Sequence, residues 1–129
     1  MMTKMPKFRA WDKFDKVMRD VTLLDYNQNF VGYSYPVFMK STMHMELMQA
    51  TGLKDKDGQE IFEGDILTDE GSELEDGWVY VSVISKDGMY YCQENNPHGI
   101  SGPLIDFIQC YSVVGNIYEN LELLENKEE

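Results

Sequence analysis

Short segments in which apolar and polar residues alternate recur along the chain, and turn residues separate them. Residues 7–11 and 17–26 both alternate, and a polar connector over residues 12–16 lies between them. Successive side chains of a β-strand point to opposite faces, so a period of two is typical of strands. The pattern therefore predicts an antiparallel N-terminal hairpin with a short loop.

The next two segments are less regular. Residues 30–39 are rich in aromatic side chains but contain Pro36, so a strand there should lie at a sheet edge or begin after the proline. Residues 43–50 fit both helical spacing and strand alternation. Ser41 and Thr42 are suitable helix caps, whereas the short length of the segment argues against a helix.

Glycines mark sharp corners in the middle of the chain. Within residues 51–67, Asp57-Gly58 lies where a tight turn must form, and Gly64 lies in a second corner directly before Asp65. Glycine adopts the positive φ angles that such turns need. The two corners predict the entry to a small, strongly bent sheet, in which Asp65 accepts hydrogen bonds from nearby backbone amides.

The clearest strand covers residues 78–85, where both faces are apolar, as is typical of a central strand. Asp87-Gly88 predicts a two-residue turn into a partner strand over residues 89–93. Residues 94–103 are rich in Asn, Pro and Gly and predict a long loop.

The C-terminal region predicts one more strand and a short helix. Residues 104–108 fit either a strand or a helical turn. Residues 110–118 predict a strand that is bent or bulged at Gly115. Asn120 can cap a final short helix over residues 121–126.

These elements together predict a mainly β protein. We expect an N-terminal β-hairpin region over residues 1–50 and a small curled SH3-like β-barrel over residues 51–129, which ends in the short helix. The corners at Gly58, Gly64 and Gly115 supply the curvature. At 129 residues the two regions can also form one compact domain, with enough buried surface to fold without disulfides or metal.

Four segments of the chain, in order, resemble the YopX family of phage and prophage proteins. They are Lys7–Asp12, Leu47–Asp55, Glu60–Ile66 and Val113–Asn120. Leu121 stands where the family usually has Pro, a departure that would lengthen the last helical turn. The resemblance implies a β-rich fold encoded in phage genomes and favours a strand for residues 43–50. It implies no activity and no catalytic residue.

Charge is distributed unevenly. The net charge is −12, and the sequence pI is about 4.4. Residues 1–56 carry nine Lys/Arg and six Asp/Glu, whereas residues 57–129 carry two Lys and seventeen Asp/Glu. The acidic balance argues against direct binding to nucleic acid or an anionic membrane. We interpret the nine acids between Asp57 and Asp76 as a solvated loop; the alternative is a polarised molecule whose basic end contacts a neighbour's acidic end.

Candidate chemistry is sparse. Cys92, His98 and Cys110 lack zinc-ligand spacing, and packed, reduced thiols are the favoured interpretation of the cysteines. Glu63 and Asp65 flank Gly64 and on a bent strand could point the same way, as a glycosidase carboxylate pair does, but a corner role is favoured for Asp65. No phosphate-binding loop or nucleophile motif is present. We therefore expect no enzymatic activity, no cofactor and no metal. Because no apolar run approaches eighteen residues, we also expect a cytoplasmic protein without membrane contact, and the family resemblance implies that the cytoplasm is that of a host cell.

The leading hypothesis is a non-enzymatic phage accessory protein that acts through protein contacts, as a homo-oligomer and with a host or phage protein as a further partner. Phe8, Arg9, Trp11 and Phe14 form its candidate interface. Arg9 and Trp11 also suit single-stranded nucleic acid, but the acidic balance favours a structural Trp. The alternative is an acidic decoy that occupies the DNA-binding site of a host protein.

Overall fold

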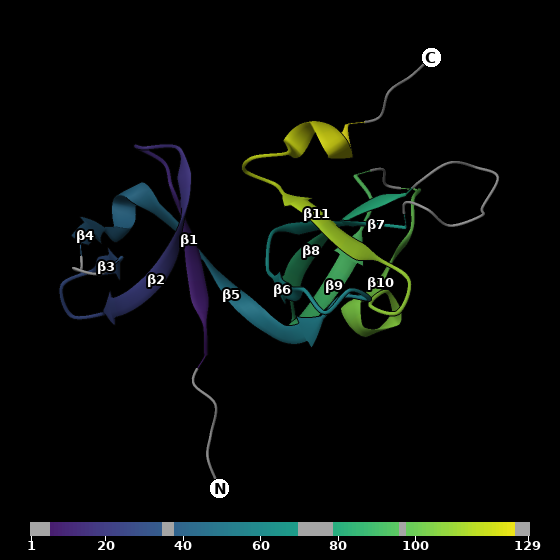
Figure 1. The fold of residues 1–129 in the computed structure, drawn as a ribbon, viewed down its shortest axis with the longest axis horizontal. Coiled ribbons are helices and arrows are strands. Elements are labelled where there is room, and N and C mark those ends of the chain that lie inside the picture. Colours follow the sequence, from purple (N-terminus) through teal and green to yellow (C-terminus); the bar gives the residue numbers. More distant parts are fainter. Residues whose placement is uncertain (1–5, 35–37, 70–78, 96–97, 126–129) are drawn as a thin grey trace, which may run out of the picture. The chain divides into compact units, whose positions relative to one another are not determined.

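The computed structural model describes residues 6–34, 38–69, 79–95 and 98–125. Within these ranges it contains eleven β-strands and three 3-10 helices of at most four residues (Figure 1). The strands are β1 (Phe8–Asp12), β2 (Val17–Asp25), β3 (Phe30–Tyr33), β4 (Phe38–Ser41), β5 (Met45–Lys54), β6 (Glu60–Phe62), β7 (Asp65–Thr68), β8 (Tyr80–Lys86), β9 (Met89–Gln93), β10 (Ser101–Pro103) and β11 (Ser112–Asn116), and the 3-10 helices are η1 (Thr42–His44), η2 (Leu104–Asp106) and η3 (Leu121–Leu124). The prediction of a mainly β protein is confirmed.

The chain divides into two compact units, residues 1–50 and residues 51–129. The strands of the first unit pair in the order β4-β3-β2-β1-β5, and each of these pairs is antiparallel. β5 continues into the second unit, where β6 is its neighbour. The predicted N-terminal hairpin is present as β1 and β2, and β1 is a central strand because β5 pairs with its other edge.

The first unit has a small apolar core made by alternate residues of its strands. This core contains Ala10, Val31, Tyr33 and Met45, with the half-buried Val21 and Leu24 packed against them. Val21 pairs with Tyr33, and Leu24 pairs with Val31. Directly opposite residues of an antiparallel pair share a face of the sheet, so the pairing register gathers these side chains on one side.

The second unit is built on a five-stranded antiparallel sheet with the order β10-β9-β8-β7-β11. β8 lies in the middle of this sheet, as its two apolar faces predict. Asp87, with φ 53°, and Gly88, with φ 80°, form the predicted two-residue turn between β8 and β9. The second core contains Ile61, Leu67, Val81, Val83, Cys92, Leu104 and Phe107.

The predicted SH3-like barrel is wrong, because the sheet of the second unit stays open with β10 and β11 at its two ends. The outer edge of β11 meets a turn instead of a strand, since the Asp55 carboxylate accepts the Val113 N–H at 2.8 Å. The expected C-terminal helix is reduced to the 3-10 turn η3. Asn120 occupies the N-cap position of η3, but its side chain makes no capping hydrogen bond, and its Oδ1 accepts the N–H of Asn116 at 3.1 Å instead.

The two ambiguous segments adopt different structures. Of residues 43–50, the first two end η1, and the rest belong to β5, so the strand interpretation is confirmed from Met45 onward. Ser41 accepts the N–H of Met43 at 3.2 Å and caps η1. Residues 104–106 form the helical turn η2. Pro36 lies outside the described residues, and the strand that follows it, β4, lies at a sheet edge as expected.

Candidate functional site

The corner residues of the second unit use their side chains to hold backbone turns. Asp55 is 7% exposed, and its Oδ1 accepts the N–H groups of Asp57 and Gln59 at 2.9 and 2.8 Å. Its Oδ2 accepts the N–H of Val113 at 2.8 Å. One carboxylate therefore closes the turn that contains Gly58 and ties this turn to β11.

Asp65 and Gly64 form the second corner. Asp65 is 2% exposed, and its Oδ2 accepts the N–H of Phe62 at 2.8 Å. Gly64 has φ 88°; its N–H donates to Val83, and its carbonyl accepts from Ile117, both at 2.9 Å. These contacts support a structural role for Asp65, because a carboxylate buried against a backbone amide is poorly placed to meet a substrate.

Gly115 lies at the irregular position of β11, where the register with β7 shifts after Val113. A Cβ atom at Gly115 would collide with the side chain of Asn120. The Oδ1 of Asn116 accepts the N–H groups of Tyr118 and Glu119 at 3.0 and 2.9 Å. This third corner is therefore also held by side chains that bind backbone.

The two cysteines lie in different environments. Cys92 is fully buried in the second core, and burial raises its pKa to about 12. Cys110 is exposed, as is His98. Over the described part of the chain, no group of three or more His, Cys, Asp or Glu side chains is arranged to hold a metal ion.

We expect the two thiols to react at very different rates. Cys110 should react with Ellman's reagent at once, and Cys92 at least about 100-fold more slowly, because the thiolate is the reactive form and burial disfavours it. Elemental analysis of the same sample should find no stoichiometric zinc. Equal reactivity of both thiols in the folded protein, or one zinc per chain, would contradict this assignment.

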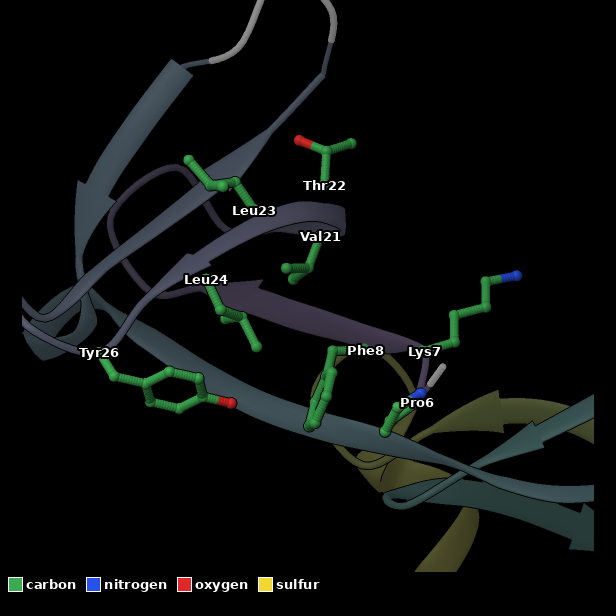
Figure 2. A pocket seen from close by; sticks show the side chains of 8 residues that line it. All are labelled: Pro6, Lys7, Phe8, Val21, Thr22, Leu23, Leu24 and Tyr26. Atoms are coloured by element: carbon green, nitrogen blue, oxygen red, sulfur yellow. The ribbon is translucent and has the colours of Figure 1, made fainter. Parts of the chain in front are cut away.

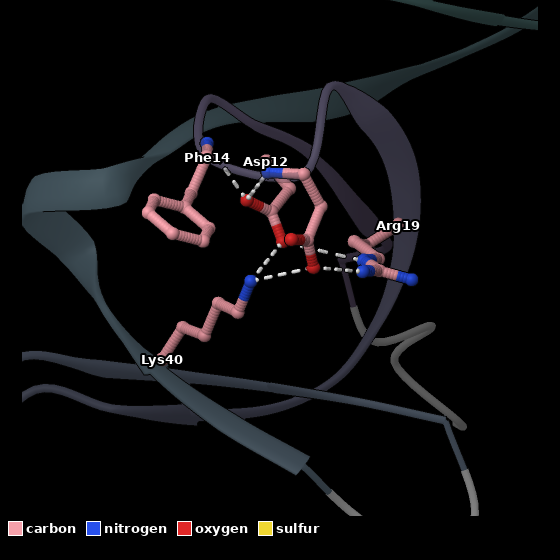
Figure 3. Close-up of polar contacts among 5 residues, drawn as sticks. Asp12, Phe14, Arg19 and Lys40 are labelled. Carbon is pink, nitrogen blue, oxygen red and sulfur yellow. Dashed lines mark hydrogen bonds and ion pairs between the residues drawn. The ribbon is translucent and has the colours of Figure 1, made fainter.

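A dense polar cluster lies behind the loop that joins β1 to β2 (Figure 3). Asp12 is fully buried, and its Oδ1 accepts the N–H groups of Phe14 and Asp15, each at 3.0 Å. Its Oδ2 accepts from Lys40 Nζ at 2.7 Å and from Arg19 Nε at 3.4 Å. A single buried carboxylate therefore fixes the loop backbone and binds two cations from β2 and β4.

Asp15 completes this cluster from the solvent side. Its Oδ2 accepts from Arg19 Nη2 at 2.7 Å and from Lys40 Nζ at 2.8 Å. The Arg19 guanidinium also lies 4.4 Å from the centroid of the Tyr33 ring. Two acids and two bases thus neutralise one another, and each cation contacts both acids.

The cluster shifts the acid–base equilibria of its members. Burial by itself raises the pKa of Asp12, but hydrogen bonds from the Asp15 N–H, the Lys40 ammonium and the Phe14 N–H outweigh it and lower the pKa to about 2. Hydrogen bonds to Asp12 and Asp15 raise the pKa of Lys40. Asp12 and Lys40 are therefore both charged at neutral pH.

The same loop presents Phe14 to solvent. Phe14 is 77% exposed, although its backbone N–H is bound to Asp12. Lys40 Nζ lies 5.5 Å from the centre of its ring, and the His44 ring meets it edge-on at 6.5 Å. Phe14, Lys40, Ser41 and His44 line a shallow cavity of about 290 Å³, which we call the hairpin-tip surface. Met43, 78% exposed, precedes His44 in η1.

The four residues of the predicted interface lie in different environments. Phe14 is strongly exposed, whereas Phe8, Arg9 and Trp11 are half-buried. Lys40 and His44 complete the surface around Phe14, and no sequence motif indicates them. The one feature of the sequence that could have indicated the polar cluster is the spacing of Asp12, Asp15 and Arg19, which suits a loop closed by ion pairs.

The described strands form two β-sheet units, and side chains that bind backbone hold the corners of the second unit. The family model described as YopX protein matches residues 7–125, and the chain belongs to the YopX family, as its sequence segments predict.

Two solved structures share the fold. Protein EF1440 from Enterococcus faecalis matches with a TM-score of 0.68 and 32% identity, over 95% of this chain and 100% of that chain. Protein yopX from Bacillus subtilis matches with a TM-score of 0.59 and 18% identity, over 92% and 98% of the two chains. Comparison with functionally curated proteins finds no match. None of the helices in the described ranges is long and apolar enough to cross a membrane.

Proposed function

We propose that this protein is a non-enzymatic protein-interaction module that contacts its partners through the hairpin-tip surface. The observation that carries the proposal is Phe14, a large apolar side chain that is 77% exposed on a loop fixed by the buried Asp12. The partners that we propose are a second copy of the chain and a host or phage protein. The family resemblance supports a phage-encoded protein that acts in the host cytoplasm.

A pre-ordered aromatic side chain is a good interface anchor. Binding energy concentrates in a few large side chains, and ordering them before binding lowers the entropic cost of association. The loop that carries Phe14 is held by two backbone hydrogen bonds to Asp12. Since Lys40 beside it is already paired with two acids, a partner can cover Phe14 without removing an unpaired charge from water.

Internal ion pairs reduce the charge that the basic segment offers to a partner. Arg19 and Lys40 bind Asp12 and Asp15, and Lys13 lies 3.2 Å from Glu46. Contacts at the hairpin tip should therefore depend mainly on apolar burial. Added salt should slow association but leave the complex formed.

The acidic-decoy alternative has weaker support. Asp65 and Asp69 belong to the acidic run of residues 57–76, yet both are buried and accept backbone N–H groups. Asp57 is exposed and accepts from the Ser112 hydroxyl at 2.7 Å. A decoy needs rows of exposed carboxylates, and several acids of this run bind the protein itself. Residues 70–76 of the run lie outside the described residues.

The test compares two exposed phenylalanines of the same unit. Phe14→Ser should raise the dissociation constant of the homo-oligomer by about 30-fold or more, since loss of an interface anchor costs about 2 kcal/mol or more. Phe38→Ser is the matched control, because Phe38 is 57% exposed but lies outside the hairpin-tip surface. Light scattering at low and high salt would measure the mass of each form.

A native protein that is monomeric in both salts would remove the homo-oligomer from the proposal. The same pair of variants would then be compared in pull-downs from infected host lysate. Equal recovery of partners by the native protein and Phe14→Ser would overturn the role of the hairpin-tip surface itself.

A further inference from the structure

The turn η1 beside the hairpin-tip surface presents a second exposed apolar side chain. Met43 is as strongly exposed as Phe14. Its neighbours in the sequence, Ser41 and His44, line the cavity of the hairpin-tip surface, whereas Met43 lies outside the lining residues. Met43 therefore does not fill the cavity of its own chain and is available to contact another molecule.

The backbone around Met43 is held on both sides. The Met43 N–H donates to the Ser41 hydroxyl at 3.2 Å, and the His44 carbonyl accepts the Lys13 N–H at 2.8 Å. Because Lys13 directly precedes Phe14, the second bond ties η1 to the loop that carries Phe14. Met43 and the cavity are thus presented together in a fixed arrangement, which lowers the entropic cost of binding.

The size and chemistry of the cavity suit one inserted side chain. Its volume of about 290 Å³ lies just below the range of small-molecule pockets, about 300–1,000 Å³. The rings of Phe14 and His44 meet edge-on, and the Lys40 side chain approaches the Phe14 ring (Figure 3). A methionine side chain adapts to irregular spaces, and its sulfur makes favourable contacts with ring edges.

Charge favours a second copy of the chain at this surface over other faces of the protein. Residues 57–129 carry two Lys and seventeen Asp/Glu, so two copies repel each other most strongly there. At the hairpin tip, the acids Asp12 and Asp15 pair with the bases Arg19 and Lys40. Two copies therefore meet with the least repulsion through the first unit.

We propose that two copies form a dimer about a two-fold axis, in which Met43 of each copy occupies the hairpin-tip cavity of the other. A projecting side chain and a cavity on the same surface make that surface complementary to a copy of itself, which a two-fold contact requires. This inference rests on the proposed function and adds to it the symmetry, the subunit number and the inserted residue.

Substitutions at Met43 test the contact. Met43→Ser should raise the dissociation constant of the dimer by about 10-fold to 100-fold, because each dimer contains the contact twice. Met43→Leu should change it by at most about threefold, since apolar volume is kept. Met39→Ser is the matched control, because Met39 is 42% exposed but does not line the cavity. Light scattering over a concentration series would measure dimerisation, and near-UV circular dichroism would verify folding.

A second control addresses the other hollow of the first unit. This hollow has a volume of about 500 Å³, shares no lining residue with the hairpin-tip surface, and has Phe8, Leu24 and Tyr26 among its lining residues (Figure 2). Tyr26 is strongly exposed, so it marks a different apolar face through which copies could meet. Tyr26→Ser should leave the dimer intact.

Cysteine cross-linking tests the symmetry directly. The background is Cys110→Ser, and Cys92 is buried. A mixture of Met43→Cys and Phe14→Cys forms mixed dimers that keep one native contact and bring the two new thiols together. A disulfide should form at least about fivefold faster in this mixture than in one of Met43→Cys and Phe38→Cys, because a disulfide needs close Cβ atoms.

A native protein that is monomeric, or that assembles beyond a dimer, would overturn this inference. Equal dissociation constants for Met43→Ser and Met39→Ser, dissociation by Tyr26→Ser, or equal cross-linking in the two mixtures would do the same. The proposed function fails by a different result, in which Phe14→Ser keeps both the native mass and the partners recovered from lysate.

Discussion

Replacing Asp12 with Ala is expected to lower the free energy of unfolding of the first unit by about 2–4 kcal/mol, because two backbone N–H groups lose their acceptor. The substitution removes the acceptor of two backbone N–H groups and leaves Arg19 and Lys40 beside a buried site with one acid in place of two. Loss of the acceptor of two backbone N–H groups costs more than loss of an exposed ion pair. Urea denaturation would measure the loss, and hydrogen exchange followed by peptide would assign it to residues 1–50.

Asp15→Ala is the matched control, because Asp15 binds the same two cations but is 41% exposed at its side chain. It should cost at most about 1 kcal/mol, as exposed pairs do. Similar losses for the two variants would show that burial of Asp12 is not the decisive feature.

The same carboxylate should make the first unit sensitive to acid. The pKa of Asp12 is about 2 in the folded protein against an ordinary value of 3.8. A depressed folded-state pKa stabilises the fold above the ordinary pKa, and this contribution is lost as the pH falls from about 4 to about 2. Asp12→Ala should therefore lose less stability than the native protein over that interval. If the free energy of unfolding fell by the same amount in both proteins between about pH 4 and about pH 2, the assignment would be contradicted.

Replacing Asp55 with Ala is expected to destabilise the second unit by about 2–4 kcal/mol. Three backbone N–H groups, those of Asp57, Gln59 and Val113, would lose their acceptor in a site where Asp55 is 7% exposed. A buried donor without a partner retains its full desolvation cost. Since Asp55 joins a turn to β11, hydrogen exchange should rise at both segments.

Two further variants separate the loss of a buried backbone acceptor from the loss of an acidic side chain at this turn. Asp57→Ala should cost less than about 1 kcal/mol, because Asp57 is exposed and binds one hydroxyl, that of Ser112. Asp55→Asn should fall between them, since one amide oxygen can still accept while its NH₂ group opposes a backbone N–H. An Asp55→Ala protein as stable as Asp57→Ala would show that the turn and β11 are held by other contacts.

These expectations give the corners of the second unit and the loop between β1 and β2 different roles. Asp55, Asp65 and Asn116 bind backbone within the second unit, so their contribution is to stability. Asp12 also binds backbone, but the loop that it fixes carries the exposed Phe14. Loss of Asp12 should therefore weaken partner binding as well as folding, whereas loss of Asp55 should affect folding alone.

Local features were accessible from the sequence. The alternation of residues 7–11 and 17–26 predicts β1 and β2, because side-chain direction in a strand depends only on neighbouring residues. Asp87-Gly88 predicts the turn between β8 and β9, since few residues adopt the positive φ angles seen there. The irregular register of β11 near Gly115 has a different cause, since a Cβ atom at Gly115 would collide with the side chain of Asn120.

Contacts between distant segments were decided by the tertiary structure. Lys40 reaches Asp12 across 28 residues of sequence, and Asp55 reaches Val113 across 58. Neither pair has a spacing that marks it, because the partners meet only through the order and register of the strands. The Asp55 contact also occupies the edge of β11 that the predicted barrel would have needed. The surface around Phe14 likewise brings Lys40 and His44 from distant parts of the chain to the loop between β1 and β2. The sequence by itself therefore determined the strands and turns, and only their assembly created the surface on which function is proposed.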